Sequence, residues 1–341
     1  MKILVTGGTG YIGSHTVVEL QQQGYEVVII DNLCNSFEWV VDNIGKISGI
    51  RPGFERIDLC DKPALTDFFA RHSDIGAVIH FAALKAVGES TEKPLYYYHN
   101  NLVSLMNLLE LMTNNDVKHL VFSSSCTVYG QPLELPVTEN TPVQESYCPY
   151  GTTKIVSENI IKDVCKISDL KAVALRYFNP IGAHESALIG ELPLGVPNNL
   201  VPYITQTAVG KREVLSIYGN NYNTPDGTCI RDYIHVVDAA KAHITAIKHM
   251  ISGVSKEKFE VFNIGTGNGN SVLEIVNTFM KVSGVNLEYR ITGRRPGDVE
   301  KVWADTSKAN RDLGWKAEKT LEDMLLSAWN WEQHTAILNH E

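Results

Sequence analysis

Short apolar runs alternate with longer amphipathic stretches through the first half of the chain. The runs are rich in β-branched residues and mostly apolar throughout, which is typical of strands covered by helices on both faces. Because this alternation builds βαβ units, the sequence predicts an α/β fold with a doubly wound parallel sheet. Helices are predicted to begin near Tyr11, Pro63, Leu95 and Pro149. The predicted strands are Lys2–Thr6, Glu26–Ile30, Phe54–Ile57, Ala77–Phe81, Leu120–Ser123 and Ala172–Arg176.

The regular pattern is interrupted beyond Phe178 by a proline- and glycine-rich stretch that extends to Pro202. A long loop of this kind more often shapes a binding site than serves as a plain linker, and its leucines are too apolar for a linker. We place a domain boundary here, with a first domain at 1–180. A smaller C-terminal α/β lobe follows at 181–341, and some of its segments are expected to pack back on the first domain. The lobe is predicted to contain helices from Leu200, Val236, Ser271 and Thr320, and strands near Val214–Ile217 and Phe259–Asn263.

The amino-acid composition argues against nucleic acid and membrane as binding partners. The chain has 341 residues, with 30 Lys and Arg against 39 Asp and Glu and a formal net charge of −9. It has no block of consecutive basic residues, so nucleic acid is an unexpected partner. No segment approaches the roughly 18 apolar residues that cross a bilayer, and the first residues lack a signal-peptide core. Six scattered cysteines without a CxxC pair indicate reduced thiols, and we expect a cytoplasmic protein.

A glycine-rich motif, Gly7 to Gly13, lies between the first predicted strand and the first predicted helix. Glycines at this point permit a tight turn and a close approach of the backbone to a pyrophosphate, which the helix N-terminus attracts. Asp31 ends the second strand, where a carboxylate accepts hydrogen bonds from ribose hydroxyls and repels a 2′-phosphate. The sequence therefore predicts a Rossmann-type site for NAD rather than NADP. The alternative for Asp31 is a turn role shared with Asn32, and Asp58 is a weaker candidate at the next strand end.

Tyr150 and Lys154 are four residues apart at the start of a predicted helix and thus share one helix face. A neighbouring ammonium and a positively charged nicotinamide would lower the pKa of the phenol, so that Tyr150 can act as a base. The Ser123–Ser125 run ends the preceding strand, at the edge of the sheet where the cofactor lies. One of these serines can bond the reacting oxygen, while others satisfy the local backbone. No histidine pair has zinc-site spacing, so no metal is expected.

Six further motifs carry a resemblance that covers the chain from Met1 to about Trp331. They are HFAALKAVGES (80–90), SSSCTVYG (123–130), RYFNPIGAH (176–184), PNNLVPY (197–203), RDYIHV (231–236) and RRPGD (294–298). With the glycine motif and the Tyr/Lys pair, they resemble the UDP-hexose 4-epimerases of the extended short-chain dehydrogenase/reductase family. The resemblance implies an isomerase that interconverts UDP-glucose and UDP-galactose through a 4-keto intermediate on tightly bound NAD.

The resemblance also implies residue roles. Tyr150 abstracts the proton of the sugar 4-hydroxyl, Lys154 binds the nicotinamide ribose and tunes Tyr150, and Ser125 holds the 4-oxygen. The NAD-binding set is Gly7, Gly10, Tyr11, Ile12, Gly13, Asp31, Asn32, Asn35, Asp58, Leu59, Phe81, Ala82, Ala83, Lys85, Asn100, Ser123, Tyr150, Lys154 and Tyr177. The UDP-sugar set is Ser125, Tyr150, Asn179, Asn199, Leu200, Ser216, Tyr218, Arg231, Arg295, Asp298 and Val302. For Arg231, the sequence by itself favours an ion pair with the adjacent Asp232 or with another nearby carboxylate.

Alternatives of two other kinds stay open at this point. Sugar-nucleotide 4,6-dehydratases share the Tyr/Lys pair, but they usually carry an Asp-Glu pair where this chain has Cys126 and Thr127. A non-catalytic NAD-sensing protein is the other alternative, because a fold alone does not establish activity.

The substrate range and the assembly are also expectations. Val302 occupies the position where many relatives restricted to UDP-glucose carry a bulky tyrosine, so UDP-GlcNAc and UDP-GalNAc are expected substrates too. An enzyme acting mainly on UDP-N-acetylglucosamine is the related alternative. A homodimer is expected from the family, through helices near Leu95–Met112 and Thr153–Lys166, although their apolar positions equally suit an intramolecular core.

Overall fold

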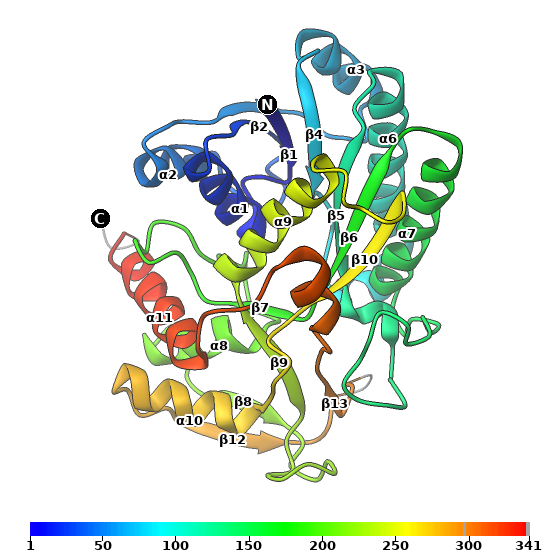
Figure 1. Ribbon diagram of the computed structural model, residues 1–341. Helices are drawn as coiled ribbons and strands as arrows, with labels where there is room; N and C mark the ends of the chain where they lie inside the picture. The colour runs from blue at the N-terminus through cyan, green and yellow to red at the C-terminus, as the bar shows by residue number, and fades with distance from the viewer. Residues whose placement is uncertain (296–297, 339–341) are drawn as a thin grey trace.

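A parallel sheet dominates the computed structural model, which describes residues 1–295 and 298–338. Its seven strands lie in the order β10-β6-β5-β4-β1-β2-β3, with the strands running side by side in the upper part of Figure 1. The strands are β1 (Lys2–Thr6), β2 (Glu26–Asp31), β3 (Gly53–Arg56), β4 (Ile75–His80), β5 (His119–Ser125), β6 (Lys171–Tyr177) and β10 (Phe259–Ile264). The predicted doubly wound α/β fold is confirmed.

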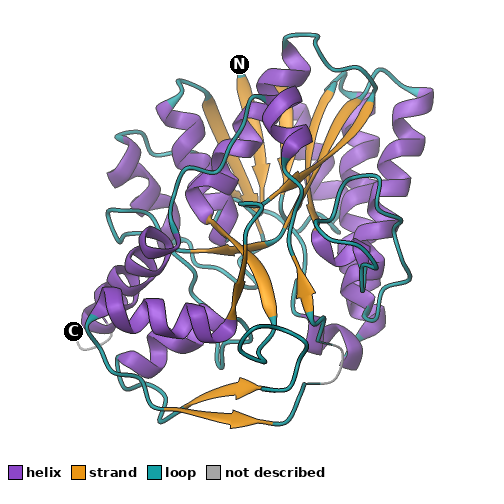
Figure 2. Cartoon of the chain, turned by 60° about the horizontal axis from the view of Figure 1, so that its bottom comes forward, coloured by secondary structure: helices purple, strands orange, loops and turns teal. Residues whose placement is uncertain are grey.

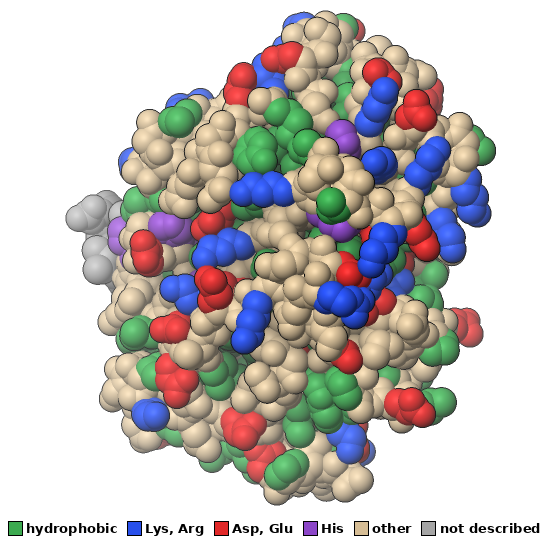
Figure 3. Space-filling view, viewed as in Figure 1, with side chains coloured by type: hydrophobic (Ala, Val, Ile, Leu, Met, Phe, Trp, Pro, Cys, Tyr) green, Lys and Arg blue, Asp and Glu red, His purple; other side chains and the backbone are tan. Residues whose placement is uncertain are grey.

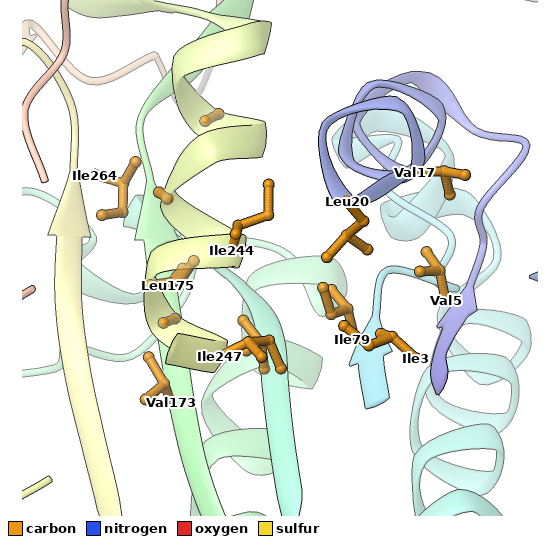
Figure 4. Packing of buried hydrophobic residues seen from close by; sticks show 14 of the residues in the cluster. Ile3, Val5, Val17, Leu20, Ile79, Val173, Leu175, Ile244, Ile247 and Ile264 are labelled. Atoms are coloured by element: carbon orange, nitrogen blue, oxygen red, sulfur yellow. The ribbon is translucent and has the colours of Figure 1, made fainter. Parts of the chain in front are cut away.

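Both faces of the sheet are covered by helices because alternate strand residues point to opposite sides and both sets are apolar. Ile3 and Val5 pack under one helical layer, while Leu4 between them packs under the other. The first layer contains α1 (Tyr11–Gln22), α2 (Trp39–Ser48) and α9 (Val236–Ile251). The second contains α3 (Lys62–Arg71), α6 (Ser104–Asn114) and α7 (Pro149–Ile167). Figure 4 shows α1 and α9 side by side, with their apolar side chains turned toward the strands.

Irregular helical segments connect β4 to α6 and follow β5. They are α4 (Val87–Glu92), α5 (Pro94–Tyr98), a π-helical turn (His99–Val103) and a 3-10 turn (Cys126–Tyr129). The helix predicted near Leu95 therefore begins at Pro94 but is interrupted by the π-helical turn before α6. Turns of this type often occur at functional sites, and this one carries Asn100.

A smaller lobe lies below the sheet in Figures 1 and 2, and it has its own apolar core. Its helices are α8 (Leu200–Ala208), α10 (Val272–Ser283) and α11 (Leu321–Leu338), whereas a further π-helical turn (Ala309–Leu313) packs against the core of the large sheet. Its strands are β7 (Asn179–Ile181), β8 (Leu215–Tyr218), β9 (Ile230–His235), β11 (Gly269–Ser271), β12 (Tyr289–Thr292) and β13 (Lys301–Val302). Strand β9 pairs with β7, β11 and β13, and β8 pairs with β12. Helix α10 begins where Ser271 and Glu274 form a capping box.

The chain crosses between the two parts more than once. After β9 in the lobe, α9 and β10 return to the large sheet, where β10 pairs with β6 along its whole length. The sequence predicts a strand near Phe259–Asn263 but not its place at the edge of this sheet. Within residues 1–295 and 298–338, no helix is both long and apolar enough to cross a membrane.

Candidate active site

The glycine motif lies at the point where the strand order reverses, between β1 and β4. Gly7 has a φ of +72°, and a Cβ atom added there would lie 2.7 Å from the backbone nitrogen of Ala82, just after β4. A Cβ at Gly13 would collide with the carbonyl oxygen of Gly7. Glycine is therefore required at both positions, because the loop packs against the neighbouring strand end and against its own helix. The crevice at such a reversal is where open α/β sheets bind their ligands.

Asp31, at the end of β2, performs the turn role that the sequence offers as an alternative. Its carboxylate accepts a hydrogen bond from the Leu33 backbone at 3.0 Å and another from the Thr9 backbone at 3.2 Å. The second bond ties the end of β2 to the glycine motif, so Asp31 is held beside it. Asn32 donates to the Asp58 carboxylate at 3.0 Å, and these two candidate residues thus lie together. An NAD molecule fits this arrangement, in which the glycines allow close backbone packing, α1 begins at the motif and the Asp31 carboxylate lies beside it.

The Tyr/Lys pair lies on one face of α7, as predicted. Pro149 occupies the first turn, and Cys148 caps the helix by accepting a hydrogen bond from the Gly151 backbone. The Lys154 side chain is buried, and its ammonium donates to the Ser123 carbonyl at 2.6 Å. The same nitrogen lies 5.8 Å from the centre of the Tyr150 ring. Helix α7 and the end of β5 therefore bring the phenol, the ammonium and the serine run together.

Burial shifts the pKa values of both Tyr150 and Lys154. It raises the pKa of the Tyr150 phenol well above its usual range, and the neighbouring Ser125 hydroxyl opposes this rise. Burial lowers the pKa of Lys154 to about 8, against the opposing charge of Glu158. The sequence predicts a lowered pKa for the phenol, but the protein's own groups raise the pKa of Tyr150 instead. The reason is that Tyr150 is desolvated while the Lys154 ammonium is bonded to a strand carbonyl.

Two predicted residues of different sets meet at Glu191, which the sequence analysis missed. Lys85, from the NAD-binding set, lies 3.3 Å from a Glu191 carboxylate oxygen. Asn199, from the UDP-sugar set, donates to the same oxygen at 2.7 Å. The Trp331 indole in turn donates to the Glu191 carbonyl at 2.9 Å. A single acid in an irregular loop carries little signal, although this loop is the one that the sequence marks as shaping a site.

Arg231 does not form the ion pair with Asp232 that the sequence by itself favours. The buried Asp232 carboxylate instead accepts hydrogen bonds from the Thr266 and Ala304 backbones, at 2.8 and 3.1 Å. Arg231 is the register partner of Val302 in β13. Its charge also opposes the burial that raises the pKa of the Cys126 thiol to about 12.

Arg295, Asp298 and Tyr218 also lie together. The Arg295 guanidinium lies 2.8 Å from the Asp298 carboxylate and 5.6 Å from the centre of the Tyr218 ring. Ser216, two residues before Tyr218, accepts a hydrogen bond from Arg290. Pro296 and Gly297 of the RRPGD motif lie outside the described residues.

The other predicted residues lie on nearby segments. Tyr11 donates to the Gly182 carbonyl at 2.6 Å, which ties the glycine motif to the lobe. Asn100 donates to Asn101, whose own side chain bonds Leu84 and Thr153 and thereby links the loop after β4 to α7. Ile12 lies in α1, Asn35 on the loop after β2, Leu59 after β3, Phe81, Ala82 and Ala83 after β4, Tyr177 at the end of β6, Asn179 in β7 and Leu200 at the start of α8. In the part of the chain that the structure describes, no group of three His, Cys, Asp or Glu side chains is arranged to hold a metal.

Comparison with known proteins agrees with this geometry. A family model described as GDP-mannose 4,6 dehydratase matches residues 4–327. UDP-glucose 4-epimerase 2 from Arabidopsis thaliana is 52% identical and covers 97% of this chain and 94% of its own length. UDP-glucose 4-epimerase from Bacillus subtilis is 51% identical, with 97% of each chain covered.

Two solved structures are similar over nearly the whole fold. The UDP-glucose 4-epimerase of Stenotrophomonas maltophila, crystallised with NAD and formylated UDP-arabinopyranose, has a TM-score of 0.96, 47% identity and 99% coverage of each chain. The Bifidobacterium longum enzyme, in complex with NAD+ and UDP, has a TM-score of 0.94 and 47% identity over 98% of this chain and 99% of its own. The chain belongs to the UDP-glucose 4-epimerase family.

Membership in the UDP-glucose 4-epimerase family decides between the classes that the sequence left open. The protein is an isomerase of the extended short-chain dehydrogenase/reductase type, not a dehydratase or a non-catalytic sensor. The description of the family model names a dehydratase, but Cys126 and Thr127 supply no acid–base carboxylates after Ser125. In this epimerase, Lys and Arg side chains lie among Asp and Glu side chains on the face shown in Figure 3.

Proposed function

We propose that the protein interconverts UDP-glucose and UDP-galactose, with NAD as a tightly held cofactor. One observation carries this proposal: Tyr150 and Lys154 lie on one face of α7 against the Ser123–Ser125 end of β5. This cluster stands at the same carboxyl edge of the sheet as the glycine motif. An acid–base group beside a dinucleotide site is what removal and return of hydrogen at a sugar carbon requires.

The chain's own residues divide the chemistry in the following way. Tyr150 removes the proton of the sugar 4-hydroxyl and returns it, and Ser125 holds the 4-oxygen. Lys154 supplies a positive charge, which favours the phenolate of Tyr150 against the burial that opposes it. The glycine motif, Asp31 and Lys85 would hold NAD. When bound, NAD supplies a hydride acceptor that is regenerated within each turnover.

The lobe would hold the UDP part of the substrate. Arg231 and Arg295 present guanidinium groups whose planar donors suit a diphosphate. Tyr218 is 46% exposed and offers a flat face to the uracil ring. Asn179 and Asn199 lie on the segments that connect the sheet to the lobe and would contact the nucleotide and sugar. The acidic protein thus needs only local cations to bind a dianionic substrate.

The function is tested by incubating the purified protein with UDP-galactose, without added NAD, and separating the products by chromatography. We expect UDP-glucose to form until the two sugars reach equilibrium, and a denatured extract to contain NAD. A 4-keto-6-deoxy product would instead indicate dehydration. The absence of any conversion by NAD-containing protein would contradict the proposed function.

We propose further that UDP-GlcNAc and UDP-GalNAc are substrates. Val302 is 6% exposed and lies in a buried cluster with Phe178. In the sheet, Val302 is the register partner of Arg231. An isopropyl group leaves room that a phenol would fill, and an acetamido group is about that size. In Val302→Tyr, the ratio of UDP-GalNAc to UDP-galactose turnover should fall at least about tenfold, whereas Val302→Ala should keep it. An unchanged ratio in Val302→Tyr would contradict this substrate range.

We propose a homodimer in the cytoplasm as the working form. An open apolar hollow between α6 and α7 is lined by Met106, Leu109, Ile160 and Val164, and Met106 is 46% exposed. All six cysteines, which fall within the described residues, are free thiols, as in a reducing compartment. Light scattering should give twice the 37.8 kDa mass of one chain. A mass of one chain at micromolar concentration would contradict the dimer, and cell fractionation checks the compartment.

A further inference from the structure

A third residue continues the line of Tyr150 and Lys154 along α7. Glu158 follows Lys154 by four residues, so all three side chains lie on one helix face. This face lies against the serine run of β5. The Lys154 ammonium donates to the Ser123 carbonyl at 2.6 Å, and the Ser124 hydroxyl donates to the Glu158 carboxylate at 2.5 Å. The catalytic helix and the serine strand are therefore joined at successive positions.

Glu158 is also held from the neighbouring strand. Arg176 in β6 lies opposite Ser124 in the sheet register. Its guanidinium forms a two-pronged ion pair with the Glu158 carboxylate, at 2.9 and 2.5 Å. A third guanidinium nitrogen donates to the Tyr129 hydroxyl at 2.9 Å, and that hydroxyl donates to the Asn263 side chain at 2.6 Å. The pair thus connects α7, β5, β6, β10 and the turn that follows Ser125.

The ion pair is buried, with Glu158 6% and Arg176 5% exposed. A buried pair of this kind often contributes no more to stability than well-packed apolar residues of similar size would, because both charges lose their hydration. Stability alone therefore does not account for it. What the pair supplies, and apolar residues cannot, is a fixed carboxylate one turn from the buried Lys154, with the balancing guanidinium held on β6. Burial lowers the pKa of Lys154, and the negative charge of Glu158 opposes this lowering.

We propose that Glu158, clamped by Arg176, is a positioning residue that keeps Lys154 charged and fixes the serine strand against Tyr150. The proposal rests on the proposed epimerase function and extends it to a buried pair outside the predicted NAD and UDP-sugar sets. With Lys154 protonated, the site keeps the positive charge that favours the Tyr150 phenolate. When Lys154 loses its proton, the phenol loses that support and turnover falls.

The test replaces both charges together, because Glu158→Gln by itself would leave Arg176 buried without its partner. One variant combines Glu158→Gln with Arg176→Gln, and a second combines Glu158→Leu with Arg176→Met to give an apolar pair. Loss of an adjacent opposite charge shifts a pKa by about one unit or more. Because both variants also remove the positive charge of Arg176, the alkaline limb of kcat for UDP-galactose should move to lower pH by less than this, by about half a unit, with KM changed much less than kcat.

A second readout does not depend on turnover. The ε-carbon chemical shift of Lys154 in ¹³C-lysine protein, assigned with Lys154→Arg, should titrate at lower pH in both pair variants. Asp163→Asn is the matched control, because Asp163 is on the same helix but pairs with Lys166 on the surface. Its pH profile and its Lys154 titration should match those of the unaltered protein.

Each possible result either supports or overturns the proposed role of Glu158 and Arg176. Pair variants that fold and keep the pH profile and Lys154 titration of the unaltered protein would overturn the proposal. Failure of both pair variants to fold would assign the ion pair to stability and would also overturn it. An unaltered protein that contains NAD but converts no UDP-hexose would instead contradict the epimerase function, so the two failures are distinguishable.

Discussion

Individual side chains in this protein behave differently from the same residues in water, and Tyr150 shows this most clearly. Its phenol is desolvated at the head of α7, and burial raises its pKa well above the usual range. Proton transfer through such a group depends on the positive charge nearby. The chemistry of the site therefore belongs to a cluster of residues rather than to the tyrosine alone.

Removing the Tyr150 hydroxyl should abolish most turnover without disturbing the fold. We expect Tyr150→Phe to lower kcat for UDP-galactose by about 10²- to 10⁴-fold, because it deletes the acid–base group. Tyr147→Phe is the matched control, since Tyr147 is 70% exposed and only three residues earlier. Equal activity of the two variants in a coupled UDP-glucose assay would refute the role of Tyr150.

At this scale, the sequence predicts which side chains meet between α7 and β5 better than it predicts the residues that support them. Tyr150, Lys154 and Ser125 were predictable because their spacing and strand-end position combine with the glycine motif. Glu158 and Arg176 were not, because a glutamate on a helix and an arginine in a strand normally face solvent. Their burial depends on the contact between α7 and β6, which no local pattern encodes.

The glycine motif shows how one element depends on another. A side chain at Gly7 would meet the backbone after β4, whereas nothing lies within 4 Å of a Cβ added at Gly24. Both glycines have a positive φ, +72° at Gly7 and +80° at Gly24. They differ, therefore, in packing rather than in backbone conformation.

This difference makes a matched pair of variants. Gly7→Ala and Gly24→Ala should each destabilise the fold by about 1–2 kcal/mol through the left-handed backbone, and Gly7→Ala should cost more because its Cβ also meets the Ala82 backbone. Only Gly7→Ala should also lose bound NAD, because it separates the motif from the end of β4. Thermal melts and the NAD content of denatured extracts measure the two effects, and equal NAD content in both variants would contradict the assignment.

Among elements, the six strands predicted in the first half agree with the structure to within two residues at each end. They were predictable because parallel strands covered on both faces are continuous apolar runs. The place of β10 in the large sheet was not, since a strand sequence does not specify its partner. Strand β9 was missed because its second and third residues, Arg231 and Asp232, are charged.

For the whole molecule, four buried histidines make the free energy of unfolding depend on pH. Burial lowers the pKa of His15 and His80 to about 3, and that of His235 and His243 to about 4. In the unfolded chain these groups take up protons near pH 6.5. The unfolded state therefore binds more protons between about pH 6.5 and 4, so stability is present above this range and is lost as the pH falls through it.

We expect the midpoint of thermal unfolding to be nearly constant at neutral pH and to fall steeply below pH 6.5. Each histidine contributes up to about 1.4 kcal/mol per pH unit to the slope. His243→Phe should reduce that slope by about one proton, since His243 packs between the rings of Phe81 and Tyr177. The partly exposed His119→Gln serves as control, and an unchanged slope in His243→Phe would contradict the prediction.

The place of β10 has a consequence for how the chain is made. A ribosome releases the first six strands of the large sheet well before residues 259–264, so the nascent chain carries an open edge along β6. In the finished molecule that edge is closed by β10 over residues 172–177. An open apolar edge readily pairs with another chain. The large sheet is therefore completed only after much of the smaller lobe has been synthesised, and a chain that stops before β10 leaves the β6 edge unpaired.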